Sequence, residues 1–98
     1  MSRFSIVLLP EAEAEVREAF LWYLERSTVA AREFRAEALE AIDGLAKSAH
    51  TWPIDEDGVR HLVLRRFPFT VVYELDNDRV TILALAHHRR RPGYWRHA

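Results

Sequence analysis

The residues best suited to chemistry gather at the end of the chain, in the stretch AHHRRRPGYWRHA, residues 86–98. Two adjacent histidines precede three arginines, a Pro-Gly pair and a Tyr-Trp pair. Histidine titrates near neutral pH and can act as a general acid or base, whereas arginine stays charged and can only bind or stabilise an anion. The stretch therefore carries groups suited to catalysis, to nucleic-acid contact or to binding a protein partner.

Metal-free cleavage of RNA is the enzymatic reaction that these residue types allow. It needs a base for the 2′-hydroxyl, an acid for the leaving oxygen and fixed cations for the charge of the transition state. Those roles could be filled, if the fold brings the side chains together, by Arg60, Arg66, His87, Arg89, Arg90 and Tyr94. A structural alternative stays open, in which His87 caps the end of a strand and the arginines are solvated.

The residue types give little support for a metal site or a bound cofactor. His87 and His88 are neighbours, and adjacent residues of a strand point to opposite faces, so the pair is poorly placed to chelate one ion. The chain has no cysteine, and its three glycines form no phosphate-binding loop. None of its serines lies in a nucleophile-elbow motif. We therefore expect no metal site and no cofactor.

Charge is divided unevenly along a chain whose net charge is only −1. Residues 1–59 carry six basic against twelve acidic side chains, and residues 60–98 carry eight arginines against three acidic side chains. This split predicts a polyanionic or acidic partner for the C-terminal half, unless acidic helices simply balance a basic sheet. The candidate contacts to a target or a nucleic acid are Arg60, Arg65, Arg66, Arg89, Arg90 and Arg91.

Tyr94 and Trp95 follow the arginines directly and allow two interpretations. Aromatic rings beside arginines can stack on the bases of single-stranded nucleic acid. The same pair can instead anchor the tail to the sheet or to a protein partner, because Trp, Tyr and Arg are frequent hot-spot residues. Pro92 and Gly93 turn the chain before the pair, so the two rings need not continue the preceding strand.

The chain of 98 residues is expected to form one domain, residues 1–98. Hydrophobic residues make up 49% and charged residues 30%, a balance typical of folded soluble proteins. The apolar run at residues 4–9 is too short for a signal sequence or a membrane span. Together with the absence of cysteine, this run leads us to expect a cytoplasmic protein without membrane contact.

Two helices and four strands are expected. Residues 3–9 predict a strand, Pro10 starts a helix of roughly 16 residues, and Ser27-Thr28 caps a second helix. Residues 48–58 predict a loop, and the strands 59–66, 67–75 and 79–87 follow, the last two joined by a tight turn at residues 76–78. The inner faces of the helices are predicted to hold Val16, Ala19, Phe20, Tyr23 and Leu24 in the first and Ala31, Phe34, Leu39, Ile42 and Leu45 in the second.

The strand at residues 79–87 is apolar on both faces, which is typical of a central strand covered on both sides. The order β-α-α-β-β-β predicts an α+β fold with a helical hairpin on one face of a mostly antiparallel four-stranded sheet. The helices cover only one face. The other face is therefore expected to be covered by a bound partner or by the C-terminal tail folding back.

The series GVRHLVLRRFPFTVVYEL and VTILALAHHRRRPGYW, residues 58–75 and 80–95, resembles the RelE/ParE toxin superfamily of type II toxin–antitoxin systems. The strand order resembles that superfamily too, and the ending RRRPGYW is most similar to its ParE, or plasmid-stabilisation, branch. The resemblance implies a growth-inhibiting toxin that binds DNA gyrase without catalysis and pairs with a cognate antitoxin in a hetero-oligomer. The alternative is a RelE-like nuclease that cuts mRNA on the ribosome with Arg60, His87 and Arg89, supported by Tyr94.

Overall fold

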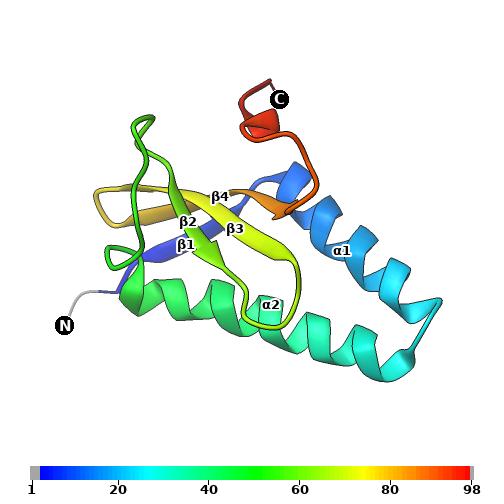
Figure 1. The fold of residues 1–98 in the computed structure, drawn as a ribbon. Coiled ribbons are helices and arrows are strands. Elements are labelled where there is room, and N and C mark those ends of the chain that lie inside the picture. Colours follow the sequence, from blue (N-terminus) through cyan, green and yellow to red (C-terminus); the bar gives the residue numbers. More distant parts are fainter. Residues whose placement is uncertain (1–2, 98) are drawn as a thin grey trace.

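The computed structural model describes residues 3–97 of the chain (Figure 1). Its elements are β1 (Ser5–Leu8), α1 (Pro10–Leu24), α2 (Thr28–Ser48), β2 (Arg60–Val63), β3 (Phe69–Asp76), β4 (Arg79–His87) and a short 3-10 helix at Tyr94–His97. The predicted order of strands and helices is confirmed, and the strand at residues 79–87 has the predicted bounds.

Local sequence signals account for where the two helices begin. Pro10 opens α1, where its missing N–H costs no helix hydrogen bond, and Glu11 and Glu13 lie in the positively polarised first turn. The Ser27 side chain caps α2 by accepting a hydrogen bond of 3.1 Å from the backbone N–H of Ala30. The helices therefore form a hairpin with a short connection.

The four strands form one sheet in the order β1-β4-β3-β2. Strands β2, β3 and β4 pair antiparallel, and β1 pairs with β4 in parallel. The prediction of a mostly antiparallel sheet is therefore confirmed, with one parallel pair at the β1 edge. The turn between β3 and β4 contains Asn77 at a φ of 55°, a left-handed conformation that asparagine tolerates.

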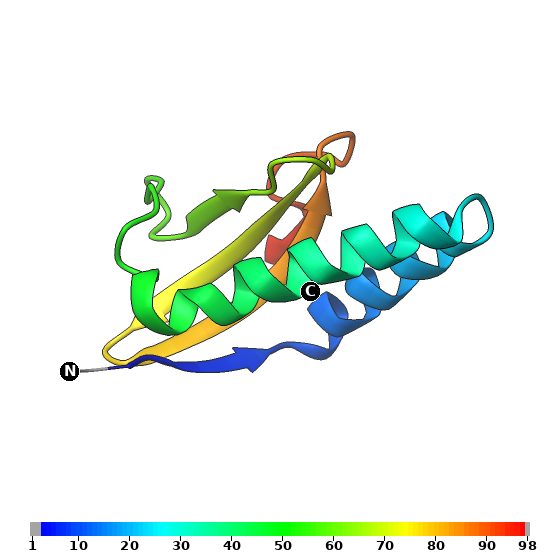
Figure 2. The ribbon, with the colours of Figure 1, turned by 90° about the horizontal axis from the view of Figure 1, so that it is seen from below.

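The helices lie on one face of the sheet and the C-terminal segment lies on the other (Figures 1 and 2). The main core fills the space between helices and sheet around fully buried Phe34, Leu45 and Tyr73. The helical stripes differ from the prediction at two positions. Leu24, the last residue of α1, is 42% exposed instead of facing the core. Leu39 is 37% exposed and Ala38 is buried in its place, because the buried residues 34, 38, 42 and 45 follow the helical repeat.

A β-bulge in β4 sets which of its apolar residues face the helices and which face the opposite side. Val72 pairs with Ala84 and Tyr73 pairs with Ile82, so Leu83 is an extra residue in β4. The extra residue reverses the alternation, and Ile82 and Leu85 both join the core under the helices. Ala84 and Ala86 then lie on the opposite face, in a second cluster with Val59 and Val72.

The C-terminal tail covers this second face. The sequence predicted this as one of two alternatives, the other being a bound partner. Tyr94 and Trp95 pack against the cluster of Val59, Val72, Ala84 and Ala86. Gly93, at a φ of 80°, provides the left-handed conformation at the turn that precedes these two rings. Within residues 3–97, no helix is both long and apolar enough to cross a membrane.

Candidate functional site

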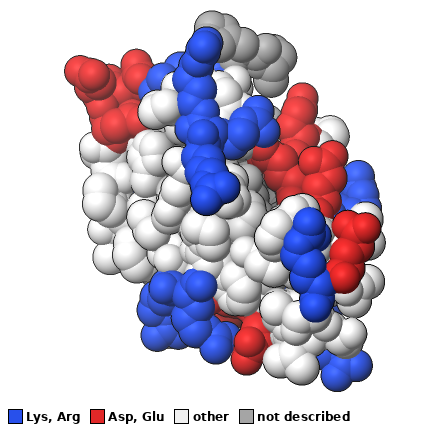
Figure 3. All heavy atoms as spheres, turned by 45° about the vertical axis from the view of Figure 1, so that its right-hand side comes forward, with Lys and Arg blue, Asp and Glu red and all other residues white. Residues whose placement is uncertain are grey.

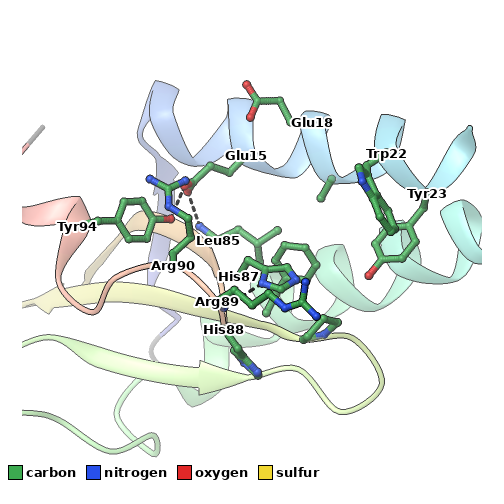
Figure 4. A pocket seen from close by; sticks show the side chains of 13 residues that line it. Glu15, Glu18, Trp22, Tyr23, Leu85, His87, His88, Arg89, Arg90 and Tyr94 are labelled. Carbon is green, nitrogen blue, oxygen red and sulfur yellow. Dashed lines mark hydrogen bonds between the residues drawn. The ribbon is translucent and has the colours of Figure 1, made fainter.

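A pocket of about 670 Å³ lies between α1 and the end of β4 (Figure 4). Its floor is apolar, and its rim carries acidic groups from α1 on one side and basic groups from the segment after β4 on the other. The residues that line it are Glu15, Glu18, Ala19, Trp22, Tyr23, Pro68, Phe69, Leu85, His87, His88, Arg89, Arg90 and Tyr94. This is the size and character of a ligand or partner-anchor pocket.

The pocket exists because β1 is shorter than β4. Leu8 pairs with Ile82, and the last parallel hydrogen bond runs from the Leu9 N–H to the Ile82 carbonyl oxygen over 3.0 Å. Beyond that point β4 continues to His87 without a strand on this side. Helix α1 crosses the open edge, and the Glu15 carboxylate accepts the Leu85 N–H at 2.9 Å.

His87 is the last residue of β4 and lies inside the pocket (Figure 4). Its Nδ1 accepts the backbone N–H of Arg89 at 3.0 Å, so the neutral ring carries its proton on Nε2. Burial first, and then the charges of Arg89 and His88, lower the pKa of His87 below its ordinary value of 6.5. The ring is therefore neutral at pH 7, and its one basic nitrogen is already occupied.

Tyr94 and Trp95 anchor the tail through polar as well as apolar contacts. The Tyr94 hydroxyl donates to the second carboxylate oxygen of Glu15. Burial first, and then the Glu15 carboxylate, raise the pKa of Tyr94 well above its ordinary value of 10.0. The Trp95 ring meets the His61 ring edge-on at 5.8 Å between centroids. The phenol therefore stays protonated, and its hydrogen bond ties the tail to α1.

Asp55 links the tail to the loop before β2. Its carboxylate pairs with His61 at 2.9 Å and lies 3.8 Å from the guanidinium of Arg96, which also pairs with Asp57. The hydrogen bond from His61 is the main reason that the pKa of Asp55 falls below its ordinary value of 3.8. The loop and the tail are therefore held together by an exposed network of charges.

This network predicts a loss of stability in acid. Because the folded-state pKa of Asp55 is depressed, its contribution is complete above pH 3.8 and disappears as the pH falls through the folded-state value. We expect Asp55→Asn to lower the melting temperature at pH 6 and to have a smaller effect near pH 2. Thermal unfolding at both pH values checks this, with Asp43→Asn on the exposed side of α2 as the control. A difference between wild type and Asp55→Asn that stays constant with pH would contradict it.

The six candidate arginines do not form one surface. The Arg60 guanidinium donates to the carbonyl oxygens of His50 and Trp52, at 3.2 and 2.8 Å, and so braces the loop before β2. Arg66 pairs with Glu33 and Glu37 of α2. The Arg65 backbone N–H also bonds to Glu37, while the Arg65 side chain is exposed.

Arg89, Arg90 and Arg91 follow β4, and all three are exposed. Arg89 and Arg90 line the pocket, whereas Arg91 does not. Of the alternative catalytic set, His87, Arg89 and Tyr94 therefore come together in one pocket, and Arg60 is held elsewhere. Among the described residues, no group of three or more His, Cys, Asp or Glu side chains is arranged to hold a metal ion.

The aromatic faces near the pocket are already occupied within the protein. The Arg26 guanidinium lies 3.7 Å from the centre of the Trp22 ring, and Arg90 lies 3.9 Å from that of Tyr94. Tyr23 stacks on Phe34, with 5.3 Å between their ring centroids. These contacts occupy part of the ring surface on which a nucleobase would stack, whereas the apolar floor of the pocket suits an aliphatic or aromatic side chain of a protein.

Exposed apolar side chains also occur on the second half of α1 and at the start of α2. Leu21, Trp22 and Leu24 of α1 are 50%, 51% and 42% exposed, and Val29 at the start of α2 is 64% exposed. Figure 3 shows a face of the molecule on which uncharged atoms occupy the centre and charged side chains of both signs lie around them. A surface of this kind is typical of a protein interface.

Sequence reasoning missed the part of the pocket that α1 contributes, above all Glu15. A signal was present, because Glu15 lies three residues after Ala12 and four before Ala19, and both alanines are buried. A carboxylate on the buried stripe of a helix needs hydrogen-bond partners. Those partners, Leu85 and Tyr94, are about 70 and 80 residues away in sequence.

The order and arrangement of the elements agree with the fold that the sequence predicted, that of the RelE/ParE-like toxins. A family profile described as the ParE toxin of the type II toxin–antitoxin system parDE matches residues 6–92. The chain therefore belongs to the ParE toxin family.

A solved chain from the chromosomal ParDE toxin–antitoxin system of P. aeruginosa has the same fold, with a TM-score of 0.76. It is 21% identical in sequence, and the alignment covers 87% of this chain and 96% of that one. A search of curated proteins gave no match.

Proposed function

We propose that this ParE toxin inhibits DNA gyrase by binding to it, makes and breaks no bonds itself, and is neutralised by a cognate antitoxin. The choice of gyrase as the target rests on the resemblance to the ParE branch. A binding mode is supported by one observation, which is that His87, Tyr94 and Arg60 of the alternative catalytic set are engaged within the protein.

His87 is poorly placed to act as the base or the acid of a ribonuclease. Its Nδ1 lone pair accepts the Arg89 N–H, so no free basic nitrogen is left on the neutral ring. Its lowered pKa makes the charged, acidic form scarce at pH 7. Tyr94 donates its hydroxyl to Glu15, and Arg60 is bound to loop carbonyls. These contacts favour binding over cleavage.

The antitoxin is proposed to contribute an acidic, amphipathic segment that binds across the pocket. The apolar floor, with Tyr23 and Phe69, and the neighbouring exposed Trp22 would receive apolar side chains. Arg89 and Arg90 at the rim would receive carboxylates. A segment bound there would cover the exposed apolar surface of α1 and exclude other partners from it.

A supercoiling assay with purified gyrase and relaxed plasmid tests the proposal. We expect saturating toxin to abolish supercoiling, the antitoxin to restore it, and His87→Gln to inhibit as well as wild type. Primer extension on translated mRNA, run in parallel, is expected to show no new cleavage positions. Full gyrase activity at saturating toxin would contradict gyrase inhibition, and codon-positioned cuts that disappear with His87→Gln would favour the ribonuclease instead.

A further inference from the structure

Glu15 occupies a position that a longer β1 would otherwise fill. Beyond Ile82 the β1 side of β4 is open, and the Leu85 N–H points into that opening rather than toward β3. One carboxylate oxygen of Glu15 accepts this N–H at 2.9 Å. The bond fixes the end of β4 to α1, directly beneath the pocket (Figure 4).

The second carboxylate oxygen of Glu15 fixes the tail. It accepts the Tyr94 hydroxyl, and the Tyr94 ring in turn carries the Arg90 guanidinium 3.9 Å from its centre. A chain of contacts thus runs from Glu15 through Tyr94 to Arg90. Arginine has a long side chain with many rotamers, so a cation–π contact to a fixed ring restricts where its charge is presented.

Arg90 lies at the rim of the pocket without a salt bridge to another described residue. Within residues 3–97, neither Arg89 nor Arg90 takes part in a salt bridge, although five other ionic contacts of arginines occur there. Both side chains lie at the rim of an apolar pocket. An unpaired, oriented guanidinium beside an apolar pocket fits a carboxylate that flanks an apolar side chain of a protein partner.

We infer that Glu15 is a positioning residue, which holds Tyr94 and thereby sets Arg90 at the mouth of the pocket to bind a carboxylate of the partner protein. This inference rests on the proposed function for the identity of the partners, the antitoxin and gyrase. It assigns Glu15 no contact with either partner.

A double-mutant cycle tests the inference with the purified cognate antitoxin as the probe. We expect Arg90→Ala to weaken antitoxin binding roughly 10- to 100-fold, as for the loss of a charge-assisted hydrogen bond. Glu15→Gln should weaken it about tenfold, and the double variant should bind no more weakly than Arg90→Ala alone. Glu13→Gln, on an exposed position of α1, is the matched control and should bind like wild type.

A spectroscopic readout separates positioning from a general loss of stability. The side-chain Nε–H resonance of Arg90 should be shifted by the Tyr94 ring in the wild type and should lose that shift in Glu15→Gln. Tyr94→Phe removes only the hydroxyl and should also abolish the shift of the Arg90 resonance. It serves as the second variant in case Glu15→Gln folds poorly. The inference would be overturned if Glu15→Gln bound the antitoxin with wild-type affinity. It would also be overturned if the two losses of affinity multiplied in the double variant, or if the Arg90 resonance did not change in Glu15→Gln.

The two proposals fail in different ways. If wild-type toxin leaves gyrase active, gyrase inhibition is wrong, and the antitoxin titration and the Arg90 resonance still decide the role of Glu15. If wild-type toxin inhibits gyrase while Glu15→Gln binds the antitoxin as wild type does, only the role of Glu15 is wrong.

Discussion

Replacing Phe34 with alanine is expected to lower the free energy of unfolding by about 3–5 kcal/mol. Phe34 is fully buried at the centre of an aromatic cluster. Its ring centroid lies 5.3 Å from that of Tyr23, 5.6 Å from that of Phe67 and 5.3 Å from that of Phe69. Truncation therefore removes contacts with α1, with the β2–β3 connection and with β3 at the same time, and it leaves a cavity between rigid elements.

Urea denaturation followed by circular dichroism measures this loss. Leu39→Ala is the matched control, because Leu39 lies on the same helix but is 37% exposed, and we expect it to cost less than about 1 kcal/mol. The loss at Phe34 is a large share of the 5–15 kcal/mol that stabilises a typical domain. A cost below about 1 kcal/mol for Phe34→Ala would show that the cluster does not hold the helices to the sheet.

Position 34 also connects the core to the pocket. Tyr23 and Phe69 pack on Phe34 and line the pocket, so the pocket floor is the outer side of the aromatic cluster. A variant with a cavity beneath this floor should bind the antitoxin more weakly and should regain stability when the antitoxin is added. The surface for binding and the core for folding are therefore parts of one packed layer.

The order and the local ends of the elements could be predicted because their signals are short-range. Pro10 and Ser27 mark helix starts through their own backbone and side-chain geometry, and Asn77 tolerates the turn conformation found there. The bulge at Leu83 is different. It depends on how β4 pairs with β3, and no residue of β4 alone requires it.

The candidate site could be predicted only where it lies on one stretch of sequence. His87, Arg89 and Tyr94 are close in the chain and come together in the pocket. Arg60 was grouped with them by residue type, but its carbonyl partners lie in the loop before its own strand. A count of charges shows how many arginines a segment has, whereas only the fold shows which of them already have a partner.

Apart from the position of Glu15 on the buried stripe, the sequence held no sign of the half of the pocket that α1 contributes, for the same reason. Trp22 and Tyr23 appeared in the sequence as part of an ordinary amphipathic helix. That helix borders the pocket only because β1 ends at Leu8 while β4 continues to His87. The difference in strand length, rather than any motif, creates the open edge at which Glu15, the tail and the arginines meet.

Tyr73→Phe is expected to cost about 1–3 kcal/mol at neutral pH, the penalty for leaving a buried carbonyl without its partner. The Tyr73 side chain is fully buried, and its hydroxyl donates a hydrogen bond of 2.6 Å to the carbonyl oxygen of Ala49. Ala49 is the C-cap of α2, so the bond satisfies one of the free carbonyls at the helix end. The variant keeps the ring and its packing and loses only this bond.

The same residue makes the protein sensitive to alkali. Burial, partly offset by the charge of Arg60, raises the pKa of Tyr73 from 10.0 to about 12. Because the folded-state value is the higher one, the contribution of Tyr73 is complete below pH 10 and disappears as the pH rises through about 12. A shift of this size corresponds to roughly 2–3 kcal/mol.

The two effects of Tyr73 combine into one measurement, the difference in unfolding free energy between wild type and Tyr73→Phe from pH 7 to pH 11.5. We expect wild type to be the more stable at pH 7 and the difference to shrink steadily above pH 10, because the variant has no phenol to ionise at this position. Tyr23→Phe, which replaces a half-buried phenol on α1, is the control and should cost less than about 1 kcal/mol at pH 7. A difference that stays constant across this range would mean that the Tyr73 hydroxyl ionises as readily in the folded protein as in the unfolded chain, and the bond to Ala49 could then not be a buried one.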